Sequence, residues 1–181
     1  RQRQMCIRDR AKPGHIRDLD KYSAEVRLKK VDFDTRYESD FRELARLGLN
    51  SYRFSLSWAR LFPRSDMTEP DPEGVTFYRN VIAAAKANGL KPHVSLFHFS
   101  TPEWFWEEKN GKRGWERPDA LSHWHRYVSA VSALFGQEIN HWCTLNEPMV
   151  YVLWGYIEGI FPPLELSLIH ISEPTRLEPS S

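Results

Sequence analysis

The stretch HWCTLNEP, residues 141–148, is strand-like and ends abruptly at Asn146, Glu147 and Pro148. Proline ends strand pairing because it has no backbone N–H to donate. Glu147 is therefore expected at the end of a buried strand, in an apolar surround that suits a general acid. The plainer alternative is a structural carboxylate satisfied by hydrogen bonds. Carboxylate chemistry on glycosidic bonds needs two such groups facing each other, so Glu147 raises the question of its partner.

Three further polar residues are candidates for the same site. Asn146 can donate and accept hydrogen bonds, which suits a sugar hydroxyl, although an isolated asparagine is more often a turn residue. Arg53 lies on the polar face of a predicted strand and, if buried, needs a carboxylate that could equally be structural. His98 ends another predicted strand at the level of Glu147. Spacing alone is equally consistent with a core histidine that donates to a carbonyl.

The remaining histidines do not favour a metal site. His123 and His125 are two positions apart on a predicted helix and therefore point to different faces. We expect no metal and no other cofactor. The segment 102–115, PEWFWEEKNGKRGW, is rich in aromatic residues. Such loops are usually packed down, but the polar neighbours make a rim that stacks on sugars a second interpretation.

A helical pattern followed by a strand pattern occurs three times. The first predicted helix is opened by a capping box at Thr35 and Glu38, is stopped by Gly48, and is followed by strand 51–58. The second and third pairs are helix 77–88 with strand 92–99, and helix 121–135 with strand 139–145. This alternation predicts an α/β fold with a parallel sheet. About three βα units amount to well under half of a (β/α)8 TIM barrel, so a partial barrel is the expected architecture.

Both ends of the chain differ from the rest. Residues 1–10 and 166–181 follow no structural period. The codons ATG TGT ATA AGA GAC can encode Met5 to Asp9, and their reverse complement, in another frame, reads through Ser167 to His170. Both ends therefore resemble translated sequencing adapters, the alternative being ordinary disordered termini. We expect residues 11–165 to be the native sequence.

The composition restricts the class of protein. The chain has 181 residues, 41% hydrophobic and 27% charged, which is ordinary for one globular domain. A net charge of +1 without a basic stripe gives no basis for a nucleic acid or membrane partner. Two distant cysteines, Cys6 and Cys143, and no visible leader make the reducing cytoplasm the default expectation.

Four blocks, YRFSLSWARLFP, LFHFSTPEWF, TLNEP and GYIEGIFPP, together resemble glycoside hydrolase family 1 in their order and separation. PGHIRD at residues 13–18 also resembles a segment near the start of some members. The resemblance covers residues 13–163, nearly all of the expected native sequence. TLNEP alone is shared with sister families of the same barrel clan, whereas the four blocks together are specific.

The resemblance implies a (β/α)8 retaining β-glycosidase that acts on a β-linked saccharide or glycoside, a β-glucoside or β-galactoside. Glu147 matches the general acid/base and Asn146 the residue that binds the sugar's 2-hydroxyl. His98 matches the histidine that holds the glycone, and Arg53 the arginine that orients the nucleophile. In such enzymes the two carboxyl groups lie about 5 Å apart.

This sequence departs from the family pattern in two ways. Phe99 and Ser100 stand where the family often has Trp and Asp or Thr, which leaves the exact glycone open. The Gln-x-Glu-Gly block and the Thr/Ser-Glu-Asn-Gly nucleophile block have no match within residues 11–165, so we expect this piece alone to be inactive and prone to aggregation. The alternatives are a non-catalytic carbohydrate-binding relative and a retaining glycosidase of a sister family, which YRFSLSW and GYIEGIFPP disfavour.

Overall fold

The computed structural model describes residues 33–139 and 141–159. These residues belong to two compact units that divide after Asn146, and each unit is described by itself. The adapter-like segments 1–10 and 166–181, the PGHIRD segment and the last residues of GYIEGIFPP lie outside the described residues.

The first unit contains a parallel sheet whose central strand is β2 (Lys91–Phe97). It pairs on one side with β1 (Ser51–Ser55) and on the other with β3 (His141–Leu145), both parallel. The predicted parallel α/β arrangement is confirmed. The first strand ends earlier than predicted because Ser57 caps the short helix α3 (Trp58–Leu61), accepting a 3.2 Å hydrogen bond from the Arg60 N–H.

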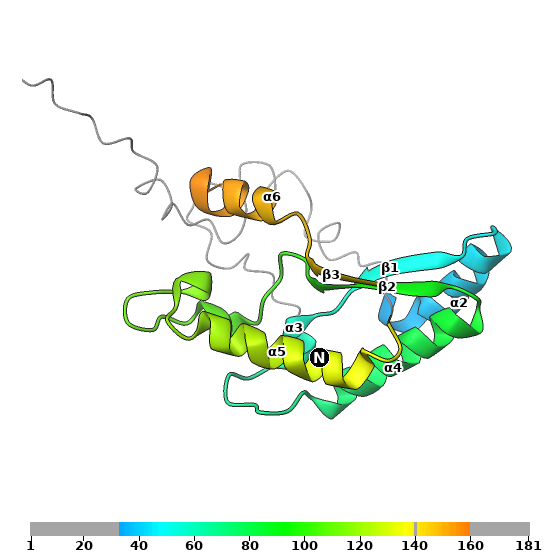
Figure 1. Cartoon of the computed structure of the whole chain (residues 1–181), viewed down its shortest axis with the longest axis horizontal. Coiled ribbons are helices and arrows are strands. Elements are labelled where there is room, and N and C mark those ends of the chain that lie inside the picture. The colour runs from blue at the N-terminus through cyan, green and yellow to red at the C-terminus, as the bar shows by residue number, and fades with distance from the viewer. Residues whose placement is uncertain (1–32, 140, 160–181) are drawn as a thin grey trace, which may run out of the picture. The chain divides into compact units, whose positions relative to one another are not determined.

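Each strand is preceded by a long helix, and Figure 1 shows these helices along one face of the sheet. They are α2 (Phe33–Arg46), α4 (Pro72–Ala87) and α5 (Ala120–Phe135). The predicted capping box is wrong, because α2 begins at Phe33 and therefore contains Thr35 and Glu38. Helix α4 begins five residues before its predicted start, where Asp71 accepts a 2.9 Å hydrogen bond from the Gly74 N–H.

The core lies between these helices and one face of the sheet. Phe54, Val94 and Leu96 point into it from the strands and are nearly inaccessible. Trp58 is 2% exposed, and its ring centroid lies 5.3 Å from that of Tyr127. The Tyr127 hydroxyl donates to the Leu96 carbonyl at 2.9 Å, and full burial raises the pKa of this phenol well above its usual 10.0.

The opposite face of the sheet is polar and partly exposed. Strand alternation places Arg53 and Ser55 there. The register sets them beside His93 and Ser95 of β2, and these in turn lie beside His141 and Cys143 of β3. The rings of His93 and His141 stack with their centroids 4.5 Å apart. The face away from the helices therefore carries the side chains that could do chemistry.

The second unit, in its described part, is one continuous helical segment. Helix α6 (Pro148–Val152) runs into a π-helical turn (Leu153–Ile157). The rings of Tyr151 and Tyr156 pack with centroids 5.8 Å apart. Single π-helical turns are often found near functional sites. Within residues 33–139 and 141–159, no helix has the length and apolarity needed to cross a bilayer.

Candidate active site

The guanidinium of Arg53 links all three strands on the polar face. Its Nε and Nη2 donate to the Ser95 hydroxyl at 3.1 and 2.9 Å. Nη2 also donates to Asn146 Oδ1 at 2.5 Å and lies 3.6 Å from Cys143 Sγ. Arg53 and Asn146, both predicted for one site, are in contact in the structure.

Asn146 is held through its backbone and its side chain. It is 6% exposed, and its N–H donates to the Phe97 carbonyl at 2.9 Å. Because arginine can only donate, the Asn146 atom that faces Arg53 must be the carbonyl oxygen. The Nδ2 amino group is therefore the part of Asn146 that remains to donate to a ligand.

His98 follows strand β2 and is oriented by the end of β1. Its Nδ1 lies 2.9 Å from the Ser55 hydroxyl, which leaves Nε2 as the ring nitrogen directed elsewhere. The next residue, Phe99, has φ 68° and packs its ring edge-on to His98 at 5.2 Å. Left-handed backbone at a residue with a side chain is strained, and such strain is concentrated at functional sites.

Glu147 lies immediately after Asn146 and is the N-cap residue of α6, with φ 44° and ψ 56°. This left-handed conformation is doubly unfavourable, because a residue before proline normally adopts an extended backbone. The expectation of an apolar surround is wrong for this chain, since the Glu147 side chain is exposed.

The aromatic loop that follows β2 is packed down and does not form an open rim. Trp104, Phe105 and Trp106 are 7%, 0% and 7% exposed. The indole N–H of Trp104 donates to the Phe62 carbonyl at 2.8 Å, and that of Trp106 to the Thr101 hydroxyl at 2.6 Å. The sugar-stacking interpretation of these three residues is therefore wrong, and the plainer alternative is correct.

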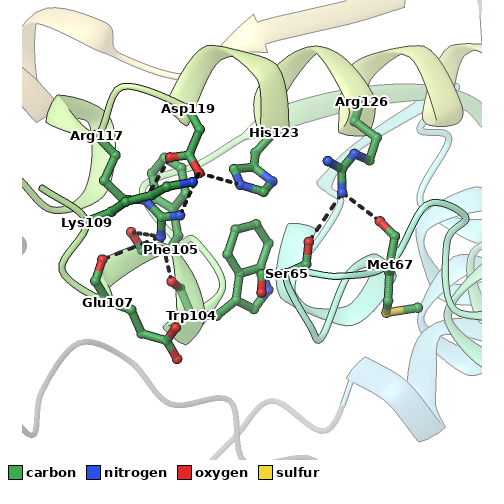
Figure 2. Close-up of polar contacts among 10 residues, drawn as sticks. All are labelled: Ser65, Met67, Trp104, Phe105, Glu107, Lys109, Arg117, Asp119, His123 and Arg126. Atoms are coloured by element: carbon green, nitrogen blue, oxygen red, sulfur yellow. Dashed lines mark hydrogen bonds and ion pairs between the residues drawn. The ribbon is translucent and has the colours of Figure 1, made fainter.

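An ionic cluster around the buried Arg117, which was not among the predicted site residues, fixes the shape of this loop (Figure 2). The Arg117 side chain is 6% exposed, and its Nη1 donates to the Trp104 carbonyl at 2.9 Å. Its Nε and Nη2 each donate to Asp119 at 3.0 Å. Lys109 and His123 contact the same carboxylate at 2.6 and 3.2 Å. His123 lies four residues after Asp119, at helical spacing, but the contacts of Arg117 and Lys109 follow no helical or strand period, so the cluster as a whole lacks a sequence signal.

The cluster predicts how acid destabilises the fold. Hydrogen bonds from Arg117, the largest cause, hold the pKa of Asp119 well below its usual 3.8. Burial lowers the pKa of His123 from 6.5. In both cases the unfolded chain binds more protons than the folded one, so the free energy of unfolding decreases as the pH is lowered. The loss begins below about pH 6.5 for His123 and below about pH 4 for Asp119.

Asp119→Asn should therefore flatten the dependence of stability on pH below about pH 4. The measurement is urea unfolding of the dilute chain, followed by tryptophan fluorescence at several pH values. Asp66→Asn is the control, because Asp66 forms an exposed ion pair with Arg64. An Asp119→Asn profile as steep as that of the unchanged chain between pH 4 and 2 would contradict this assignment.

A metal site is not apparent in the described ranges, where no group of three His, Cys, Asp or Glu side chains is placed to hold an ion. Instead, His123 is engaged by Asp119.

A parallel sheet with crossover helices, and with polar side chains at the carboxyl ends of its strands, is the arrangement of a (β/α)8-type domain. Residues 5–173 match Glycosyl hydrolase family 1. The chain belongs to this family.

Several characterised proteins resemble the chain. Coniferin β-glucosidase from Pinus contorta is 37% identical over 158 residues, which are 87% of this chain and 29% of that protein. Among solved structures, rice Os3BGlu6 β-glucosidase is 31% identical with a TM-score of 0.73, over 88% of this chain and 31% of that one. The β-glycosidase from Pyrococcus horikoshii is 35% identical with a TM-score of 0.67, over 75% and 30%.

The chain thus spans about a third or less of the length of these relatives. The predicted fold class is confirmed, because the structural relatives are TIM barrels and the described sheet is a three-stranded parallel part of such a fold. The predicted family is confirmed as well.

Proposed function

We propose that the whole protein is a retaining β-glycosidase acting on β-glucosides, with Glu147 as its general acid/base. The observation that carries this proposal is the 2.5 Å contact of Arg53 with Asn146. This contact connects Arg53 of the first strand to Asn146, the residue directly before Glu147. Because Asn146 Oδ1 accepts from Arg53, its Nδ2 group is left to donate to a ligand. The names of the relatives support the substrate class, since they are β-glucosidases or β-glycosidases.

Each residue has one task in this mechanism. Glu147 gives its proton to the glycosidic oxygen while a second carboxylate attacks the anomeric carbon, and Glu147 then takes a proton from the water that hydrolyses the glycosyl-enzyme. Asn146 donates from Nδ2 to a sugar hydroxyl, and His98 contacts the glycone through Nε2. Arg53 directs its remaining N–H groups to the attacking carboxylate.

The attacking carboxylate belongs, in this proposal, to a part of the protein outside residues 11–165. The resemblance assigns it to a Glu-Asn-Gly strand end, which that range lacks. We accordingly propose that residues 1–10 and 166–181 are non-native and that the chain alone does not hydrolyse glycosides. Because Phe99 and Ser100 depart from the family pattern, the glycone stays open, and a β-galactoside is the second candidate substrate class.

A hybrid barrel tests this function. In it, residues 33–159 replace the matching segment of rice Os3BGlu6 β-glucosidase, and a second hybrid uses the Pyrococcus horikoshii β-glycosidase. We expect at least one hybrid to hydrolyse 4-nitrophenyl β-glucoside, whereas the 181-residue chain alone does not. Soluble hybrids that bind the glucoside without hydrolysis would support the non-catalytic alternative instead. Turnover by the purified chain alone would show that the attacking group lies within it.

A further inference from the structure

Ser95 is a buried polar residue in the middle of the central strand. It is 0% exposed, and its register partners are Ser55 on β1 and Cys143 on β3. Its neighbours along the strand, Val94 and Leu96, point to the core on the other face. A buried hydroxyl needs a hydrogen-bond partner, and the Ser95 hydroxyl accepts two hydrogen bonds from Arg53.

These two bonds determine which edge of the guanidinium is free. Arginine has five N–H donors in a rigid plane. Ser95 accepts from Nε and Nη2, and Asn146 accepts from Nη2 as well. All of these acceptors are neutral. Within the described part of the chain, no carboxylate forms an ion pair with Arg53 and its Nη1 group donates to no partner.

We propose that Ser95 is a positioning residue that orients Arg53, so that Nη1 and its positive charge point toward the attacking carboxylate. This inference rests on the proposed function and extends it by one residue, which does not itself contact the sugar. Without the Ser95 hydroxyl, the Nε–H has no acceptor among the described residues, and of these only Asn146 and Cys143 still hold the flexible Arg53 side chain. A carboxylate displaced by about 1 Å attacks about 100-fold more slowly.

The test compares Ser95→Ala with Ser95→Thr in an active hybrid barrel. Alanine removes the hydroxyl, whereas threonine keeps it at the same place. We expect Ser95→Ala to lower kcat by about 10- to 100-fold with KM little changed, and Ser95→Thr to restore kcat to within about threefold of the unchanged hybrid. The control Ser129→Ala, on the exposed surface of α5, should leave kcat unchanged.

A double-mutant cycle separates positioning from a general packing role. In a background of Arg53→Met, Ser95→Ala should add less than about a threefold further loss, because the group that it orients is absent. Full activity of Ser95→Ala, failure of Ser95→Thr to restore kcat, or an undiminished effect of Ser95→Ala in the Arg53→Met background would each overturn the proposal.

A measurement independent of activity keeps this inference separate from the proposed function. In hybrids labelled with 15N-arginine, the Arg53 Nε–H should exchange slowly with water in the unchanged and Ser95→Thr proteins and rapidly in Ser95→Ala. If the hybrids hydrolyse nothing but show this difference, the proposed function fails while the orientation of Arg53 by Ser95 holds. Equal exchange rates in all three proteins would refute the orientation itself.

Discussion

Glu147→Gln should lower the hydrolysis of an alkyl β-glucoside by the hybrid barrel about 100- to 10,000-fold. Glutamine keeps the size and polarity of the side chain but cannot transfer a proton. An alkoxide leaving group needs that proton, so the first step of the reaction becomes slow. Steady-state kinetics at pH 7 measure the effect. Glu158→Gln is the matched control, because Glu158 is an exposed carboxylate in the same unit and should be replaceable without loss.

A second substrate tests whether Glu147 acts by transferring protons or is needed for another reason. An aryl β-glucoside of an acidic phenol releases its phenolate without needing a proton, so Glu147→Ala should still form the glycosyl-enzyme from it. The second step then lacks its general base, and added azide, which needs no deprotonation, should restore turnover and yield a glycosyl azide. If azide has no effect, or if Glu147→Gln is as active as Glu158→Gln, Glu147 is not the acid/base.

Arg117→Ala should lower the free energy of unfolding by about 3–5 kcal/mol. The substitution leaves the Asp119 carboxylate partly buried without its bidentate partner, and the Trp104 carbonyl loses its 2.9 Å donor. The aromatic loop then has no fixed path, so Trp104 and Phe105 lose their packing on Trp58. Since whole domains are stable by only about 5–15 kcal/mol, much of the variant should be unfolded at 37 °C.

Urea unfolding followed by tryptophan fluorescence measures this loss, and Arg113→Ala supplies the comparison. Arg113 is in the same loop, but its 3.7 Å ion pair with Glu108 is about half exposed on both sides. Exposed pairs of this kind contribute about 0–1 kcal/mol. A similar loss in both variants would mean that Arg117 acts as an ordinary surface charge.

The order of helices and strands could be predicted because its signals are local. Gly48 and Gly89 end α2 and α4 with φ values of 83° and 73°, a conformation that glycine adopts without strain. Alternating burial in β1 could be read directly from residues 51–55. The start of α4 at Asp71 and Pro72 also carried a signal, an N-cap aspartate before a proline, which is independent of apolar periodicity.

The site could be predicted only in part, because residue types do not fix orientations. Arg53 and Asn146 were expected in one site, but only the structure shows that neutral acceptors hold the arginine. The aromatic loop was ambiguous because exposed and buried tryptophans have the same composition. The Arg117–Asp119 cluster depends on how the loop folds back over itself, and Gly114 permits that path, since any side chain there would overlap the Trp106 ring.

The left-handed backbone of Glu147 costs stability at the same position that carries the carboxylate. Glycine adopts this conformation readily, so a change to glycine would relieve strain of about 1 kcal/mol or more while removing the carboxylate. A library of variants selected for thermal stability alone would therefore enrich proteins that have lost the proposed general acid/base. Stability and catalytic competence must be selected together wherever this segment is engineered.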